Sequence, residues 1–121
     1  MGLSTHVLDT MHGRPAVGMK VQLFTTQVSL QRQQAVLVKS FVLNDHGRSP
    51  EGPLYDSAGL RAGTYRLVFD VAAYFKAQGV TLPEPAFLDQ VSLDFGVADT
   101  SQHYHVPLLV SPWSYSTYRG S

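Results

Sequence analysis

The side chains best suited to chemistry in this chain are two histidines, His103 and His105, separated by one tyrosine. On a β-strand, alternate residues project from the same face, so the two imidazoles would lie about 7 Å apart on one surface. Imidazole titrates near neutral pH and can accept or donate a proton during a reaction. A single His-x-His pair on a strand is nevertheless more often a surface feature than a site, so the pair needs partners from elsewhere in the chain.

A third histidine, His6, lies in the segment Leu3-Ser-Thr-His-Val-Leu-Asp9. If Leu3 and Val7 face the core from a strand, His6 projects outward together with Ser4. If this strand and the His103 strand share a surface, three imidazoles converge. They could then serve either as acid–base groups or as the ligands of a zinc ion.

Arg48 is the candidate for binding an anion. It follows the turn Asn44-Asp-His-Gly47, which would hold the arginine at the start of the next segment. Its planar, permanently charged guanidinium suits an oxyanion or the edge of a planar amide. Considered alone, an exposed turn arginine without function is the simpler interpretation. His12 and His46 lie in turn-like sequences, and we expect them to be solvated.

The last four residues, Tyr118-Arg-Gly-Ser121, follow a segment rich in aromatic and β-branched residues. Chain ends are usually frayed. A terminus of this composition is expected to pack against the fold. Because it follows His103 and His105 closely in the sequence, we expect it to form part of the same site.

Motifs of other reaction types are absent from the sequence. It contains no Gly-x-Ser-x-Gly elbow, no His-Glu-x-x-His pair and no glycine-rich phosphate or dinucleotide loop. It also contains no cysteine, which excludes disulfides, thiolate nucleophiles and cysteine-bound zinc. An enzyme of this sequence would use histidine, arginine and water on an activated substrate, without a cofactor.

Composition favours a single domain, residues 1–121, that binds neither nucleic acid nor membrane. The nine basic and nine acidic residues cancel, and no run of Lys or Arg forms the basic face that nucleic acid or anionic lipid requires. No apolar run approaches the roughly 20 residues of a membrane-spanning helix. The first residues do not resemble a secretory signal, so we expect a cytoplasmic location.

Most of the sequence alternates apolar and polar residues with the period of a β-strand. The strand candidates are residues 3–8, 17–24, 35–43, 65–69, 91–97, 104–110 and 115–118. Asp at the N-cap position and Gly after the last turn predict one short helix within residues 70–79. Together these elements predict an all-β fold, an antiparallel β-sandwich of seven to eight strands with one short helix.

Two irregularities are expected within the strands. The alternation in residues 35–43 changes parity, which indicates a β-bulge. Pro107 lies inside a strand pattern although proline cannot donate to a ladder, which favours an edge, a bulge or a place where pairing is interrupted.

Taken together, these segments resemble the 5-hydroxyisourate hydrolases, the enzymatic branch of the transthyretin-related proteins. The resemblance spans essentially the whole chain and includes the strand count and the single helix. The terminal Tyr-Arg-Gly-Ser tetrapeptide is its specific marker, because the hormone-carrying transthyretins lack it. The matching segments are Leu3–Asp9, Gly13–Ala16, the Asn44-x-x-Gly-Arg48 turn, His103–Pro112 and Tyr118–Ser121.

The resemblance implies hydrolysis of 5-hydroxyisourate to 2-oxo-4-hydroxy-4-carboxy-5-ureidoimidazoline, a step of urate breakdown. It also implies a homotetramer, a dimer of dimers with active sites at the dimer–dimer interface. The catalytic residues that it implies are His6, Arg48, His105 and Ser121. Those that it implies for substrate binding are His6, Arg48, His103 and Tyr118. Neither the resemblance nor the residues decide which histidine is the general base.

Three other interpretations remain at this stage. A non-catalytic carrier of a small aromatic ligand would share the fold, but it predicts an apolar channel without paired histidines and a facing arginine. A zinc site on His6, His103 and His105 would require all three imidazoles to converge on one ion. An immunoglobulin-like adhesion module would have no use for the Tyr-Arg-Gly-Ser end.

Overall fold

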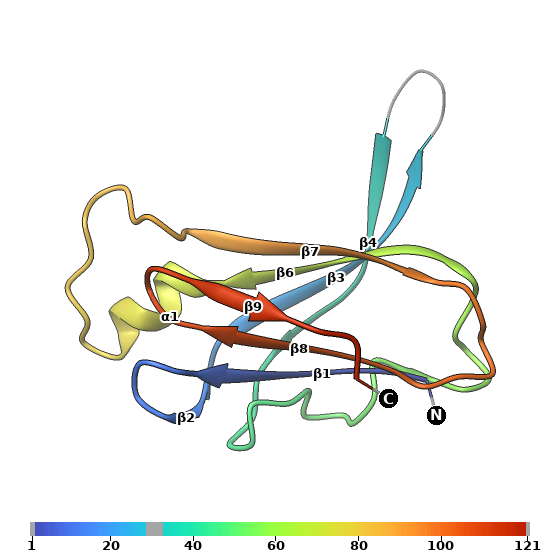
Figure 1. The fold of residues 1–121 in the computed structure, drawn as a ribbon, viewed down its shortest axis with the longest axis horizontal. Helices are drawn as coiled ribbons and strands as arrows, with labels where there is room; N and C mark the ends of the chain where they lie inside the picture. The colour runs from blue at the N-terminus through green and yellow to red at the C-terminus, as the bar shows by residue number, and fades with distance from the viewer. Residues whose placement is uncertain (1, 29–32, 121) are drawn as a thin grey trace.

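Two β-sheets pack face to face in the computed structural model, which describes residues 2–28 and 33–120 (Figure 1). The first sheet has the order β2-β1-β8-β9, with β5 also paired to β1, and its strands are β1 (Gly2–Asp9), β2 (Arg14–Pro15), β5 (Tyr55–Asp56), β8 (Tyr104–Val110) and β9 (Tyr115–Thr117). The second has the order β4-β3-β6-β7, with β3 (Lys20–Val28), β4 (Gln33–Val42), β6 (Gly63–Asp70) and β7 (Gln90–Val97). The predicted β-sandwich with one short helix, α1 (Val71–Ala77), is confirmed.

The core lies between the sheets and is built by the alternation seen in the sequence. In β1, Leu3 and Val7 are fully buried, and in β6 the same is true of Leu67 and Phe69. Burying each such side chain contributes roughly 1.5–3 kcal/mol to stability. Because one face of each strand is occupied by the core, the polar residues of β1 and β8 are left on the outer face of the first sheet.

One strand pair departs from the expected antiparallel arrangement. β1 and β8 run parallel, with Ser4 opposite His105 and His6 opposite Pro107, whereas the other strand pairs of the described residues are antiparallel. Tight hairpins impose antiparallel pairing, but β1 and β8 are separated by nearly the whole chain, so no turn dictates their relative direction. The parallel register places His6 of β1 and His105 of β8 on the same outer surface of the first sheet.

Both predicted strand irregularities are confirmed. The β3–β4 register shifts between the pairs Leu23↔Lys39 and Phe24↔Leu37, which leaves Val38 as the extra residue of a bulge. β8 pairs with β9 as far as Leu108↔Thr117, and pairing resumes only at the bridge between His105 and Gly120.

Pro107 lies in the gap between these two stretches of pairing. It has no N–H to donate, and its carbonyl accepts a hydrogen bond from the Thr117 hydroxyl at 2.7 Å. The gap leaves Tyr118 and Arg119 outside the ladder, and Gly120 returns to it.

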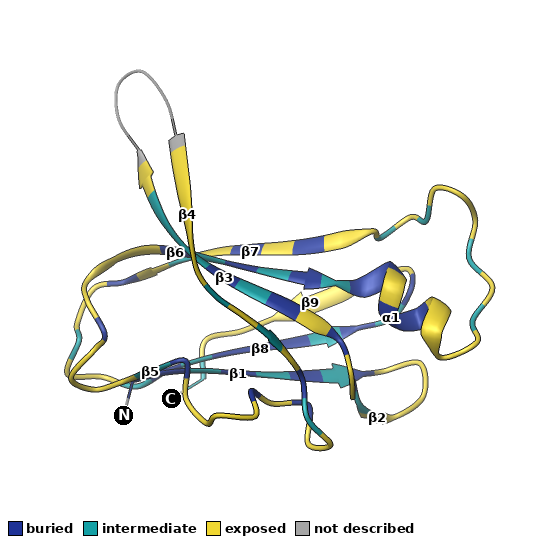
Figure 2. Ribbon diagram, turned by 180° about the vertical axis from the view of Figure 1, so that it is seen from behind, coloured by how far each residue is buried: buried dark blue, intermediate teal, exposed yellow. Residues whose placement is uncertain are grey.

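Helix α1 covers one end of the sandwich and buries Val71 and Phe75 against the core (Figures 1 and 2). Asp70 occupies the predicted N-cap position, but its side chain makes no capping bond and instead accepts from the Gln90 amide at 2.7 Å. Gly79, with φ of +86°, follows the helix end as predicted. No helix within the described ranges has the length and apolar character needed to cross a bilayer.

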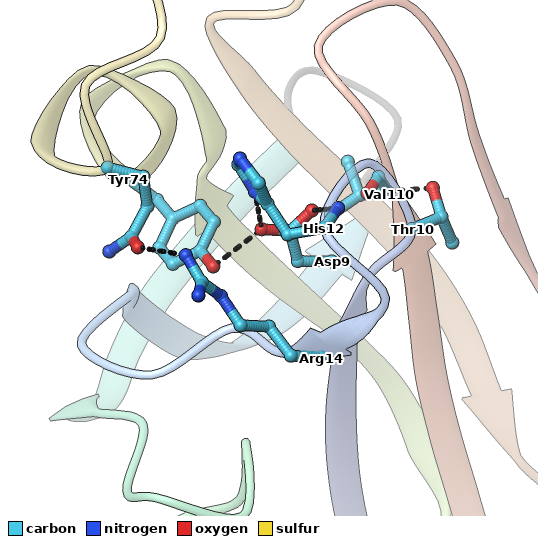
Figure 3. Close-up of polar contacts among 7 residues, drawn as sticks. Asp9, Thr10, His12, Arg14, Tyr74 and Val110 are labelled. Atoms are coloured by element: carbon cyan, nitrogen blue, oxygen red, sulfur yellow. Dashed lines mark hydrogen bonds and ion pairs between the residues drawn. The ribbon is translucent and has the colours of Figure 1, made fainter.

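A buried carboxylate anchors the end of β1 to this helix (Figure 3). Asp9 is completely buried and accepts hydrogen bonds from the His12 ring at 2.6 Å and the Tyr74 hydroxyl at 2.7 Å. Burial acts to raise the pKa of Asp9, but the bonds from His12 and Tyr74 hold it below its usual value. Burial and the Asp9 carboxylate raise the pKa of Tyr74 to about 12. His12 is exposed, as the sequence predicted, but one side of its ring is held by the bond to Asp9.

Candidate active site

The outer face of the first sheet brings together His6, His103, His105 and Arg48. Figure 2 shows the alternation of buried and half-buried residues along β1 and β8. The three histidines are half-buried and Arg48 is exposed. Arg48, His6 and His103 all lie close enough to the His105 ring to influence its pKa. Four of the residues that the sequence predicted for a site therefore form one cluster.

Arg48 reaches this cluster because its turn is attached to β1. The Asn44 side-chain oxygen accepts from the backbone N–H groups of His46 at 2.9 Å and Arg48 at 3.1 Å, which closes the turn. The Val7 N–H donates to the Gly47 carbonyl at 3.0 Å, and His6 and Arg48 form an antiparallel bridge. Gly47 has φ of +72°, and a Cβ there would lie 2.6 Å from the Val7 carbonyl oxygen, so only glycine fits.

The environment favours the neutral form of two of these histidines. The pKa of His6 is lowered by burial and then by the Arg48 charge, and a hydrogen bond that the His6 ring donates to the His46 backbone acts in the opposite direction. The pKa of His105 is lowered by burial, then by Arg48, His6 and His103. Both imidazoles thus start from below the usual value of 6.5 and are neutral at pH 7. A neutral imidazole can take a proton from water or donate its own N–H.

Ser4 belongs to the cluster, although sequence reasoning gave it no role. Its Oγ lies 2.8 Å from His105 Nδ1 and 3.1 Å from His103 Nε2. The alternation of residues along β1 had predicted that Ser4 shares a face with His6, and this was the sequence signal for a role of Ser4 in the site. Its contact with His103 and His105 depends on the parallel register of β1 and β8, which no local pattern encodes.

The terminal segment meets the cluster through Gly120. His105 N–H donates to the Gly120 carbonyl at 3.2 Å, and Gly120 N–H donates to the His105 carbonyl at 2.7 Å. The expectation that the terminus packs against the fold is confirmed up to this residue. Ser121 lies outside the described residues.

Two cavities flank the first sheet; His103 and Arg48 line the smaller one, and His6 and His105 line neither. A cavity of about 400 Å³ is lined by Ser4, Arg48 and His103, together with residues of the Arg48 turn and the loop after it. Another, of about 470 Å³, lies between β7 and the terminal segment and is lined by Tyr118 and Arg119 among others. Tyr118, predicted to bind substrate, thus lines a different cavity of this chain and is 60% exposed.

The geometry does not favour the zinc alternative. Within residues 2–28 and 33–120, no three His, Cys, Asp or Glu side chains are grouped so that they could hold a metal ion. His103 and His105 instead share the Ser4 hydroxyl as a hydrogen-bond partner. The cluster contains imidazoles, which can transfer protons, and a guanidinium, which can bind an anion.

The chain is similar to known proteins in both sequence and fold. Residues 3–120 match the HIUase/Transthyretin family. The chain is 52% identical to 5-hydroxyisourate hydrolase 2 of Rhizobium meliloti (strain 1021), over 98% of this chain and 95% of that protein. Among solved structures, it is similar to (S)-allantoin synthase, with a TM-score of 0.89 and 44% identity over 99% of this chain and 43% of that one.

The fold is shared with a carrier as well. Sea bream transthyretin in complex with thyroxine gives a TM-score of 0.82, at 26% identity, over 99% of this chain and 95% of that one. Overall shape thus does not separate hydrolase from carrier, because both have the same sandwich. Among solved structures, the Klebsiella pneumoniae 5-hydroxyisourate hydrolase is 31% identical to the chain, with a TM-score of 0.77.

Proposed function

The chain belongs to the HIUase/transthyretin family, and within this family we propose that it hydrolyses 5-hydroxyisourate to 2-oxo-4-hydroxy-4-carboxy-5-ureidoimidazoline. The observation that carries the proposal is the cluster of three imidazoles and one guanidinium on the outer face of the first sheet. A carrier of an apolar ligand would need an apolar surface there. The similarity to hydrolases over nearly the whole chain supports the same conclusion.

The reaction requires water to open a ring at a carbonyl carbon. The product carries a new carboxylate and a ureido group, so the water oxygen bonds to the carbonyl carbon and the ring C–N bond breaks. One proton leaves the water and one reaches the departing nitrogen. Neutral imidazoles suit both steps, and His6 and His105 are the groups proposed for them. Such proton transfer typically contributes about 10²- to 10⁴-fold to the rate.

Arg48 is proposed to bind the planar, anionic substrate and to stabilise the oxyanion that forms when water adds. Its guanidinium keeps its charge at all relevant pH values and can donate two parallel hydrogen bonds. Because its turn is bonded to β1 beside His6, the charge is held in place before the substrate arrives. Such preorganised donors commonly supply a large share of a rate enhancement.

The remaining proposed site residues surround this centre. His103 lines the 400 Å³ cavity together with Arg48 and is proposed to contact the substrate. Ser121 is proposed as a catalytic residue on the resemblance alone, and it directly follows Gly120, which is paired with His105. Tyr118 is proposed to bind substrate once chains assemble, since in the single chain it lines the other cavity.

We further propose a homotetramer, a dimer of dimers with active sites at the dimer–dimer interface. Arg48 is exposed on the single chain, so the site is open on one side. On the same outer face, Leu8 and Leu109 are paired across β1 and β8 and remain half-buried. A second copy covering this apolar pair would close the site against water. A cytoplasmic location is proposed on the absence of cysteine, which is compatible with a reducing compartment.

The decisive experiment follows the absorbance of freshly prepared 5-hydroxyisourate with the purified chain, a His105→Ala variant and a protein-free blank. We expect the wild-type chain to accelerate the loss of substrate and His105→Ala to lose about 10²-fold or more of that activity. Thyroxine binding, measured by equilibrium dialysis, tests the carrier alternative. Substrate loss at the blank rate together with thyroxine binding would refute the proposal.

A chain that ends at Thr117 tests the role given to the terminus. It keeps the whole of β9 but lacks Tyr118 to Ser121 and the Gly120 bridge to His105. We expect it to fold, because the core residues are untouched, and to be nearly inactive. Full activity of this shortened chain would remove the terminal residues from the proposed site.

A further inference from the structure

The hydroxyl of Ser4 contacts both His105 of β8 and His103, which lies just before this strand. Its Oγ is 2.8 Å from His105 Nδ1 and 3.1 Å from His103 Nε2, both within hydrogen-bond distance. The parallel register that places Ser4 opposite His105 is what creates this contact.

The chemistry of a hydroxyl limits how these two bonds can form. A serine side chain has one proton to donate and two lone pairs that accept. It can therefore donate to only one of the two imidazoles, and at least one imidazole must donate an N–H to it. If both rings donated, the hydroxyl proton would be left unpaired, because Ser4 Oγ has no other hydrogen-bond partner among the described residues. Two arrangements use the hydroxyl proton, and they differ in which nitrogen of each ring carries the proton.

The environment of His103 distinguishes between these arrangements. Its Nδ1 is buried and has no hydrogen-bond partner among the described residues. A proton on this atom would be an orphaned buried N–H, which is rarer in folded proteins than an under-satisfied acceptor. The proton of His103 therefore lies on Nε2 and is donated to Ser4. The Ser4 proton is then donated to His105 Nδ1, which must be unprotonated, so neutral His105 carries its proton on Nε2.

We propose that Ser4 is a positioning residue that holds His105 as the Nε2–H tautomer, so that His105 donates a hydrogen bond to the substrate and His6 is the general base. The inference rests on the proposed hydrolase function and assigns the roles that the residues alone left open. His105 Nε2–H would polarise the ring carbonyl and stabilise its oxyanion, and it can pass its proton to the departing nitrogen.

Two further observations agree with this assignment. Among the described residues, the charged and titratable groups that act on His105 are Arg48, His6 and His103, and none of these three is an anion that would favour a protonated imidazole. The hydrogen bond between His6 and the His46 backbone uses one nitrogen of the His6 ring, which leaves the other free to accept a proton from water.

Nitrogen-15 NMR of histidine side chains tests the tautomer directly, without any turnover. In the wild-type protein at pH 8 we expect His105 to show a pyridine-type Nδ1 and a pyrrole-type Nε2. In Ser4→Ala this pattern should give way to a mixture of tautomers, and Ser4→Thr, which keeps the hydroxyl, should retain it. A pyrrole-type Nδ1 in wild-type His105, or an unchanged pattern in Ser4→Ala, would overturn the proposal.

Kinetics of the same variants supply the second readout. Ser4→Ala should lower kcat by about 10²-fold, a larger effect than any change in KM, because Ser4 is proposed to act on the reaction through His105. Ser4→Thr should recover most of the activity, and the melting temperatures of both variants should stay near the wild-type value. Wild-type kcat in Ser4→Ala would contradict the positioning role. If the wild-type chain has no activity, the hydrolase proposal fails, while the NMR result still decides the tautomer.

Discussion

His105 and Gly120 lie face to face across the end of the first sheet, with two backbone hydrogen bonds of 3.2 and 2.7 Å between them. The imidazole packs against the glycine: a Cβ added to Gly120 would lie 3.0 Å from His105 Cβ and 3.1 Å from Cδ2. The terminal Tyr-Arg-Gly-Ser segment thus contributes the surface on which a proposed catalytic ring rests. Glycine is the residue that allows the ring to lie so close.

A methyl group at this position should displace the ring without unfolding the protein. Gly120→Ala is expected to lower kcat by about 10²-fold, the usual cost of misplacing a reacting group by around 1 Å. Gly96→Ala is the matched control, because that strand glycine has open space where its Cβ would be placed. Equal activity of the two variants, measured on 5-hydroxyisourate, would show that the contact does not position His105.

The charge of Arg48 should set the acid limb of the pH profile. Burial first and Arg48 second lower the pKa values of His6 and His105. A base must be neutral to act, so activity falls as the pH drops through this lowered pKa. In Arg48→Gln the pKa rises towards 6.5, although burial still holds it below that value, and the acid limb of kcat/KM moves to higher pH.

Arg48→Lys separates charge from shape in the same measurement. It keeps the positive charge and should leave the acid limb near its wild-type position. It loses the bidentate fork, so KM should rise. An acid limb that does not move in Arg48→Gln would mean that the Arg48 charge does not act on the base.

The pair formed by Leu8 and Leu109 should be required for assembly. Leu109→Asp introduces a charge on the outer face of β8, away from the core, where the proposed second dimer would cover it. We expect sedimentation to show dimers instead of tetramers, with activity reduced by at least about tenfold because the site loses its cover. Gln22→Asp, on the outer face of the other sheet, is the control and should stay tetrameric. A tetrameric, active Leu109→Asp variant would contradict the proposed interface.

The Asp9 carboxylate should stabilise the fold without taking part in the reaction. Asp9→Ala removes a buried charge that accepts bonds from His12 and Tyr74, and should cost about 3 kcal/mol of unfolding free energy. Tyr74→Phe removes one of these bonds and should cost about 1–2 kcal/mol. Urea unfolding at a fixed protein concentration measures both, and kcat of the folded fraction should not change.

The pH dependence of this stabilisation has a definite sign. The pKa of Asp9 is lower in the folded protein than its usual value of 3.8. Its contribution is therefore complete above that value and is lost as the pH falls through the folded-state pKa. The difference in stability between the wild type and Asp9→Ala should shrink below about pH 4. A constant difference down to pH 2 would show that the charge of Asp9 is not what stabilises the fold.

The sequence by itself determined the β-sandwich, the single helix and the direction in which most side chains point. Period-two alternation requires His6 to face away from the buried Leu3 and Val7, and places His103 and His105 on one face of their strand. The turn before Arg48 and the interruption at Pro107 could also be predicted, because proline, glycine and asparagine act on the local backbone. These effects act between residues that are close in the chain, so they can be predicted from a single sequence.

Only the tertiary structure decided which of these faces meet. The Ser4 and His105 side chains are 101 residues apart in the chain and 2.8 Å apart in space. Their contact depends on the parallel register of β1 and β8, which arises from packing two sheets around a common core and not from any turn between the strands. A shift of that register by one residue would turn Ser4 and His6 to the other face. The proton positions inferred for His103 and His105 follow from that register.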